Sequence, residues 1–324
     1  MRNNANRHYN RLINARPRVI LEPQLKELGI VSKSQVSEYS LFNGEQLIAD
    51  IKFAEHSEFV DQFNIVESTR SFKNGKRTPT FHASADNIDY RIYYPGKEFT
   101  GNSFRPARPP RFITTNLNPW KNETLTRNFL SSGLKPKNED ILIFSDIDEI
   151  IDARYFAQVI EFAKAHGVAT VKIHFTLYFF NLFSENYGGP EDYSYRVFIM
   201  TGEYYNKMKI TPDELRKNGE AGKLVNEIKC FPLIAGFHHS WIGDSEFVAT
   251  KLASYAHGPE DHNSRLFDTR SRVDLSVVEE LLSGKKSMYG GDHRLKIRND
   301  IPMLASVEKL KDTSLAKYFA TDGY

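Results

Sequence analysis

Short apolar runs alternate along the chain with segments in which apolar residues recur at helical spacing. Runs with the character of buried strands occupy residues 63–68 (FNIVES), 140–146 (DILIFSD), 168–175 (VATVKIHF) and 175–183 (FTLYFFNLF). Helical spacing occurs over residues 44–54, 124–133 and 152–166. Gly133 and Gly167 stand where the last two helices should end, because glycine readily closes a helix. This pattern predicts an α/β protein.

Strand, helix and strand follow one another between residues 140 and 175. This order predicts a βαβ unit and therefore a mostly parallel sheet flanked by helices. Ligands of such sheets bind at the carboxyl ends of the strands. The sequence SDIDE (145–149) lies at one of these ends, so its position alone makes it a candidate functional site.

Three parts can be distinguished along the chain. We interpret residues 1–37 as a basic arm, residues 38–300 as a single α/β domain, and residues 301–324 as a C-terminal extension. Five arginines precede the first acid, Glu22; they are Arg2, Arg7, Arg11, Arg16 and Arg18. Transit peptides share this arginine-rich and acid-poor composition, but we favour a solvated arm.

Composition narrows the class of protein. The 324 residues are 40% hydrophobic and 26% charged, as in soluble domains, and the net charge of +2 argues against a nucleic-acid-binding protein. The single cysteine, Cys230, excludes an intrachain disulfide. No apolar run approaches the roughly 18–20 residues of a membrane span, and no signal-peptide pattern is present. We expect a cytoplasmic protein of microbial or viral origin, or a soluble form of an anchored enzyme.

Three carboxylates fall within four residues of the SDIDE sequence: Asp146, Asp148 and Glu149. Like charges at the end of a buried strand raise the free energy of the fold unless a cation neutralises them. Carboxylate oxygens with no cysteine nearby suit a hard cation such as Mg²⁺ or Mn²⁺, which keeps positions open for phosphate oxygens. We therefore expect a divalent metal that holds a phosphorylated substrate.

Two other interpretations of the acidic cluster deserve comparison. Acids also favour the first turn of a helix because of the helix dipole, and a helix is predicted just after the cluster. This first alternative stays open. Aspartate-nucleophile phosphatases also place Asp-x-Asp after a strand, but they need Thr or Ser where this chain has Ile150, so the second alternative is disfavoured.

Four stretches occur in order along the chain. They are residues 41–81, which begin LFNGE and contain VDQFNIVES; residues 123–134 (ETLTRNFLSSGL), followed by DILIFSDIDEI; residues 235–243 (AGFHHSWIG); and residues 251–262 (KLASYAHGPEDH). Each resembles a block of glycosyltransferase family 17, which includes β-1,4-mannosyl-glycoprotein N-acetylglucosaminyltransferase. The chain departs from the family at Ile151, where proline is usual, and at His239, where cysteine is common.

The resemblance implies a single-domain GT-A glycosyltransferase with a Rossmann-like sheet. It also implies metal-dependent transfer, with inversion, of a sugar (GlcNAc in this family) from a UDP-sugar donor to a glycan acceptor, with Mn²⁺ or Mg²⁺ as cofactor. Two other functions compete with this one. The same carboxylates suit a metal-dependent nucleotidyltransferase or phosphohydrolase, and a decayed site suits a non-catalytic glycan-binding protein.

Roles at the metal follow from the resemblance. Asp148 is expected to ligate the metal directly, and Asp146 to complete the metal site by contacting a metal-bound water or the donor ribose. A third ligand in this fold often comes from later in the chain. His238 and His257 are the candidates, because neutral imidazole suits Mn²⁺. Glu149 is expected either beside these ligands or as a helix cap.

Four further residues are expected to bind the donor. Arg127 and Lys251 are candidates for its diphosphate, since Arg binds oxyanions as a fork and Lys as a point charge. Glu67 and Ser68, at the end of the FNIVES run, are candidates for the uracil and ribose. Structural ion pairs and a strand-end cap are the alternative interpretations of these side chains.

An inverting transfer needs a general base, which is usually a carboxylate. Asp244 and Glu246 follow directly after HHSWIG and are the candidates, with Glu191 and Asp192 as runners-up. Trp241 is interpreted as a core residue rather than as a platform for a sugar ring.

Overall fold

The computed structural model describes residues 34–99, 118–185, 193–220, 228–256, 262, 264–268, 272–289 and 293–321. Contacts divide the chain into two units, Met1–Ser34 and Gln35–Tyr324. The predicted basic arm lies almost wholly outside the described residues, and the fold below is that of the second unit.

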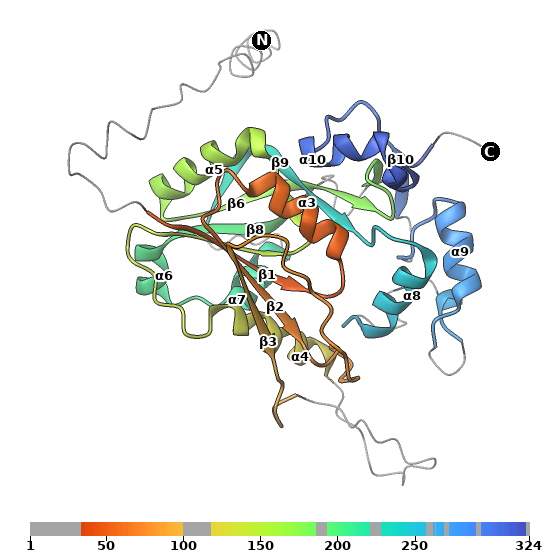
Figure 1. Ribbon diagram of the computed structural model, residues 1–324, viewed down its shortest axis with the longest axis horizontal. Coiled ribbons are helices and arrows are strands. Elements are labelled where there is room, and N and C mark those ends of the chain that lie inside the picture. Colours follow the sequence, from red (N-terminus) through yellow and green to blue (C-terminus); the bar gives the residue numbers. More distant parts are fainter. Residues whose placement is uncertain are drawn as a thin grey trace. The chain divides into compact units, whose positions relative to one another are not determined.

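One mixed sheet organises the second unit (Figure 1). Its strands are β1 (Val36–Phe42), β2 (Gln62–Ser68), β3 (Ile88–Tyr93), β4 (Ile141–Asp146), β5 (Glu149–Ile151), β6 (Val168–Leu177), β7 (Leu182–Glu185), β8 (Tyr193–Thr201), β9 (Lys229–Ser240) and β10 (Arg294–Ile297). The main path runs β10-β7-β6-β8-β4-β1-β2-β3, and β9 pairs with both β5 and β6. Strands β4, β1, β2 and β3 are parallel, whereas β8 is antiparallel to its neighbours β4 and β6.

Helices cover both faces of this sheet. They are α3 (Gln46–His56), α4 (Pro119–Asn128), α5 (Ala153–His166), α6 (Gly202–Met208), α7 (Pro212–Glu220), α8 (Ser245–Ser254), α9 (Leu275–Ser283) and α10 (Ala305–Glu308). Among the helices of the described residues, none has the length and apolar character that crossing a membrane requires.

Strand β4 shows why its sequence is an unbroken apolar run. Ile143 packs in one cluster with Phe53 of α3 and Phe156 of α5. The neighbouring Leu142 points to the other face and packs in a cluster with Leu215 of α7. Because both faces of the strand are covered, no polar alternation is needed. The predicted fold class, an α/β sheet flanked by helices, is confirmed.

The predicted strand–helix–strand unit is present as β4, α5 and β6. Gly167 has a φ of 79° and ends α5, as predicted. The two strands are not neighbours, however, because β8 lies between them and is antiparallel to both. The later strand β8 therefore lies between the two strands that were predicted to be parallel neighbours.

The prediction of one core strand over residues 175–183 is wrong. Strand β6 ends at Leu177, Tyr178 has a left-handed φ of 65°, and β7 begins at Leu182. The Tyr178 amide donates to Ser240 O of β9 at 3.1 Å, which holds the turn. Tyr178 and Phe180 are buried in this turn, so the apolar run gives no sign of the break.

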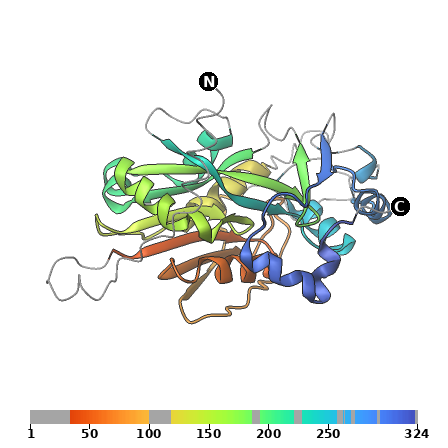
Figure 2. The same ribbon diagram turned by 90° about the horizontal axis from the view of Figure 1, so that it is seen from above.

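The segment after residue 300 packs against α3. Met303 and Leu304 lie in one apolar cluster with Ile48 and Ile51 of that helix. Glu55 Oε2 accepts hydrogen bonds from the Ser306 amide at 3.0 Å and from the Ser306 hydroxyl at 2.6 Å. Figure 2 shows the dark blue C-terminal segment beside the orange helix α3. Residues 301–321 therefore contribute to the core of the unit.

Gly236 provides a test of how tightly β5 and β9 pack. A Cβ at this position would lie 2.2 Å from the Ile150 backbone oxygen, and a backbone atom cannot move aside as a side chain can. We expect Gly236→Ala to lower the free energy of unfolding by at least about 2 kcal/mol, measured by urea denaturation. Gly75→Ala is the control, because its Cβ would meet only the Ser71 hydroxyl at 3.2 Å. Equal stability of the two variants would contradict the close approach.

Candidate active site

The SDIDE sequence forms a turn between two strands. Asp146 ends β4, Ile147 and Asp148 form the turn, and Glu149 begins β5. Helix α5 starts only at Ala153, with Asp152 as its cap. The alternative in which these acids occupy the first turn of a helix is therefore wrong.

A cleft opens beside this turn and encloses about 490 Å³, its open mouth included. Its lining comes from seven places in the chain: Leu41 of β1 with Asn43 and Glu45 just after it; Phe72; Glu123 and Arg127 of α4; Asp146, Ile147 and Asp148; Arg216 of α7; His238, Ser240 and Trp241 of β9 and its end; and Lys251 and Tyr255 of α8 and its end. The carboxyl ends of β1 and β4, which are parallel neighbours, meet here.

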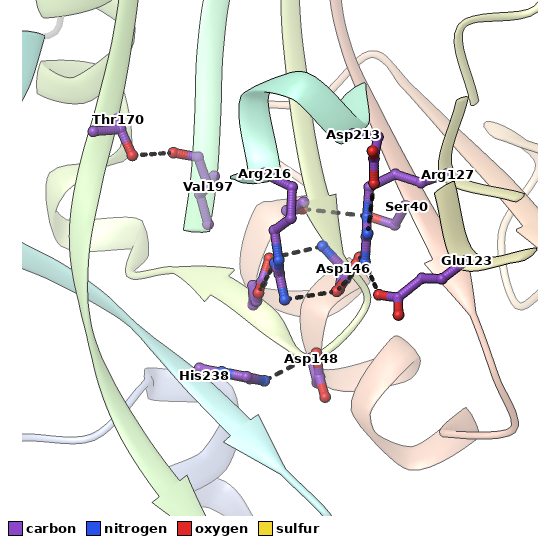
Figure 3. Close-up of polar contacts among 12 residues, drawn as sticks. Ser40, Glu123, Arg127, Asp146, Asp148, Thr170, Val197, Asp213, Arg216 and His238 are labelled. Carbon is purple, nitrogen blue, oxygen red and sulfur yellow. Dashed lines mark hydrogen bonds and ion pairs between the residues drawn. The ribbon is translucent and has the colours of Figure 1, made fainter. Parts of the chain in front are cut away.

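Two arginines converge on Asp146 from different helices (Figure 3). The Nη2 atom of Arg127 lies 3.3 Å from Asp146 Oδ2, and the Nη2 atom of Arg216 lies 3.0 Å from the same oxygen. Burial opposes ionisation of Asp146, but the two guanidinium groups outweigh it and lower its pKa to about 2. Arg127 is itself fixed by Glu123, whose Oε1 lies 2.7 Å from the guanidinium.

Asp148 contacts a second set of bases. Its Oδ1 lies 3.4 Å from His238 Nε2, and its Oδ2 lies 3.4 Å from Lys251 Nζ. Burial opposes ionisation of Asp148, yet His238 and Lys251 hold the pKa of its carboxyl well below the usual range. Lys251 also lies 2.7 Å from Glu45 Oε1, and these two acids keep its pKa raised despite burial. Its ammonium stands 5.1 Å from the centroid of the buried Trp241 ring.

Glu149 faces back into the fold. Its Oε2 accepts a hydrogen bond from the Asp146 amide at 2.8 Å, and its Oε1 pairs with Arg216. In the antiparallel pairing of β5 with β9, Glu149 stands opposite His238. The His239 amide of β9 donates to Asp148 O at 2.8 Å and so ties the turn to the same strand.

The described residues include one cluster that fits a metal. Ligand atoms of Asp148, Glu149 and His238 lie within 4.8 Å of one another, and all three residues are buried. Two carboxylate oxygens and one imidazole nitrogen form a donor set suited to Mn²⁺, and less closely to Mg²⁺. Asp146 is not in this set, and its Oδ2 lies within 3.3 Å of both arginines.

The structure brings together five of the ten predicted site residues. Asp146, Asp148, His238, Arg127 and Lys251 all line the one cleft. The other predicted metal ligand, His257, and the runner-up bases Glu191 and Asp192 lie outside the described residues.

Glu67 and Ser68 do not line the cleft. The Glu67 carboxylate is fully buried and accepts from the amides of Thr80 and Phe81, at 3.0 and 3.1 Å, and from the Tyr90 hydroxyl at 2.8 Å. The Ser68 hydroxyl accepts from the Arg70 amide at 3.1 Å. These contacts give both side chains structural roles, as strand-end caps, in the described residues.

The predicted general bases also lie outside the lining of the cleft. Asp244 is exposed and caps α8, where its Oδ1 accepts from the Phe247 amide at 2.9 Å. Glu246 is exposed in the first turn of the same helix. Their role as bases stays a prediction.

Three charged residues of the cleft, Glu45, Glu123 and Arg216, were not predicted as site residues from the sequence. Glu123 begins the stretch ETLTRNFLSSGL that resembles family 17, which is the signal that could have found it. Arg216 follows no motif, and its only local sign is its place in a helix with acids in the first turn. Glu45 had a signal, because it belongs to the LFNGE start of the block that resembles family 17. The same block contains Asn43, which lines the cleft beside it.

A model of glycosyltransferase family 17 matches residues 26–218, which is more than half of the chain. The chain belongs to glycosyltransferase family 17. The match contains Arg127, Asp146, Asp148 and Arg216, so family membership covers the acidic turn and both arginines. The protein is accordingly a glycosyltransferase.

Other comparisons are weaker. No curated protein matches this family 17 chain. Among solved structures, TarS from S. aureus has 9% identity, covers 76% of this chain and 69% of its own, and gives a TM-score of 0.34. The galactosyltransferase LgtC with donor and acceptor sugar analogs has 10% identity, covers 60% of this chain and 72% of its own, and gives a TM-score of 0.30. Mannose-6-phosphate isomerase from Helicobacter pylori has 11% identity, covers 53% of this chain and 73% of its own, and gives a TM-score of 0.28. These scores are too low to carry an argument.

The arginine pairs of Asp146 predict a specific loss of stability in acid. The folded pKa of Asp146 is lowered from 3.8 to about 2, so the carboxylate stabilises the fold above pH 3.8 and loses this effect as the pH falls toward 2. About 2 kcal/mol should disappear between roughly pH 5 and 2. Urea unfolding at several pH values would measure it, and Asp146→Asn should show a shallower decline. Parallel curves for the two proteins would contradict the ion pairs.

Proposed function

We propose that this family 17 glycosyltransferase transfers a sugar, GlcNAc in the first instance, from a UDP-sugar to a glycan acceptor with inversion and with the help of Mn²⁺ or Mg²⁺. One observation carries the proposal. Asp148 and His238 line the cleft beside Arg127, Arg216 and Lys251, and ligand atoms of Asp148, Glu149 and His238 lie within 4.8 Å of one another at the carboxyl end of β4.

The charges of the cleft suit a metal with a diphosphate. Four lining carboxylates, those of Glu45, Glu123, Asp146 and Asp148, face the three cationic side chains Arg127, Arg216 and Lys251. The acids outnumber these cations, so the cleft favours a bound cation over a bound anion alone. Asp148, Glu149 and His238 would hold the metal, which as a Lewis acid would stabilise charge on the leaving phosphates. Lys251 and the two arginines are placed to hold phosphate oxygens beside it.

Two other functions use the same residues. A nucleotidyltransferase or phosphohydrolase would break a phosphate bond and release a sugar phosphate instead of UDP. A glycan-binding protein would bind sugar without turnover. Family membership favours transfer over both of them.

Donor hydrolysis tests the proposal without a known acceptor. The purified protein would be incubated with Mn²⁺ and a panel of UDP-sugars, and free UDP measured. We expect release from one donor, its abolition by EDTA, and a fall of about 100-fold or more in Asp148→Asn, because a metal ligand is lost. Asp50→Asn is the matched control, since Asp50 is an exposed acid on α3 that does not line the cleft. Release of sugar phosphate, or no UDP binding with Mn²⁺, would refute the proposal.

The general base can come from either of two groups of acids. Asp244 and Glu246 were predicted from sequence, but both are exposed on α8 away from the lining. Glu123 lines the cleft, and Arg127 holds its Oε1 while the buried Oε2 has no hydrogen-bond partner among the described residues. The other lining acids have both oxygens in contact with bases or amides. This difference supports Glu123 as the base.

Three variants distinguish the candidates once an acceptor is known. We expect Glu123→Gln to lower the transfer rate 10²- to 10⁴-fold, the usual contribution of a general base. Asp244→Asn keeps the helix cap, because asparagine caps as well as aspartate. This variant and the separate variant Glu246→Gln should each retain the transfer rate within about threefold. Thermal unfolding of each variant controls for loss of fold. A large loss in either α8 variant alone would instead assign the base to that helix.

A further inference from the structure

A lysine is buried directly beneath the acidic turn. Lys52 belongs to α3, and its side chain has no exposure to solvent. Its Nζ lies 3.0 Å from Glu38 Oε1, 3.0 Å from Ser40 Oγ and 2.7 Å from Ser145 Oγ. It also donates to two backbone oxygens, Asp146 O at 2.9 Å and Glu149 O at 3.0 Å.

The two backbone contacts bracket the proposed metal ligand. Asp146 O precedes Asp148 along the chain and Glu149 O follows it, so one ammonium group fixes both arms of the turn. A buried carbonyl without a hydrogen-bond partner raises the free energy of the fold, so these two donations favour the observed path of the turn. The carboxylates of the turn are held separately, by Arg127, Arg216, His238 and Lys251.

A second base of α3 extends this attachment. His56, one turn after Lys52, lies 2.9 Å from Ile151 O through Nε2 and 2.7 Å from Glu38 Oε2 through Nδ1. Glu38 thus joins the two bases. Burial opposes ionisation of Glu38, but His56 and Lys52 lower its pKa to about 2, so it is a carboxylate at neutral pH. Together, Lys52 and His56 form hydrogen bonds to three backbone carbonyls, those of Asp146, Glu149 and Ile151.

We infer that Lys52, with Glu38, is a positioning residue for the metal and donor: it fixes the backbone on either side of Asp148 so that Asp148, Glu149 and His238 meet. This inference rests on the proposed function for its metal, but the positioning itself can be measured without one. A buried ion pair can often be replaced by apolar groups of similar size without loss of stability. The role assigned to Lys52 is therefore to hold the turn through two hydrogen bonds to its carbonyls, rather than to stabilise the fold.

The central experiment uses the double variant Glu38→Gln with Lys52→Met, which removes both charges and keeps their volume. Two quantities would be measured: the Kd of Mn²⁺ in the presence of UDP by calorimetry, and backbone hydrogen exchange of the segment 141–151. We expect the Kd to rise about tenfold or more, as when partners behind metal ligands are lost, and exchange in this segment to accelerate while β2 and β6 keep their protection.

Val278→Ala is the control for stability alone. Val278 is buried in α9 and packs in an apolar cluster that contains neither Lys52 nor any residue of segment 141–151. It should destabilise the fold and leave the Kd and the exchange of segment 141–151 unchanged. If the double variant does not fold, Ser145→Ala removes the 2.7 Å contact of Lys52 and should shift both quantities less, in the same direction.

The outcomes separate the two claims. If the wild-type protein binds no Mn²⁺ with UDP, the proposed function fails, and faster exchange in the variant still supports the positioning role. If exchange and Kd in the double variant match those of Val278→Ala, Lys52 only stabilises the fold and the inference is overturned.

Discussion

The repulsion of three carboxylates at one strand end is the constraint on which the rest of the unit depends. Asp146, Asp148 and Glu149 cannot share a buried turn without compensation, and the compensation comes from four places in the chain. Arg127 arrives from α4, Arg216 from α7, His238 from β9 and Lys251 from α8. Helices from both halves of the chain therefore each bring a base to this one turn.

The sheet makes these meetings possible. The strand pairing of β1 with β4 brings Asn43 and Glu45 to the same edge as the acidic turn. The antiparallel pairing of β5 with β9 sets His238 opposite Glu149. Gly236 lets β9 approach the Ile150 backbone closely enough for that pairing. Backbone geometry thus positions the acids and the imidazole, and side-chain charge then holds the surrounding helices.

Local pattern was sufficient to predict features that depend on neighbours in sequence. The apolar run before Asp146 and the acidic pair after it located the turn, and Gly167 located the end of α5. Arg127 and Lys251 were found through the family resemblance, and both reach the cleft. Features that depend on partners distant in sequence were not predicted. Arg216 pairs with Asp146 and Glu149, far earlier in the chain, and no local spacing indicates this pairing. Glu67 was expected to bind a nucleotide, but in the described residues it accepts hydrogen bonds from the Thr80 and Phe81 amides and from the hydroxyl of Tyr90 in β3.

Glu55 connects parts of the chain that are synthesised far apart in time. Its Oε1 accepts the amide of Ala153 at the start of α5, and its Oε2 accepts the amide and hydroxyl of Ser306. During translation, α3 and α5 leave the ribosome long before residues 301–321. Until those residues arrive, Ile48 and Ile51 have no apolar cover from Met303 and Leu304, and Glu55 lacks half of its partners. The helix that carries Lys52 thus gains its last partners only after Ser306, 251 residues beyond Glu55, has been synthesised.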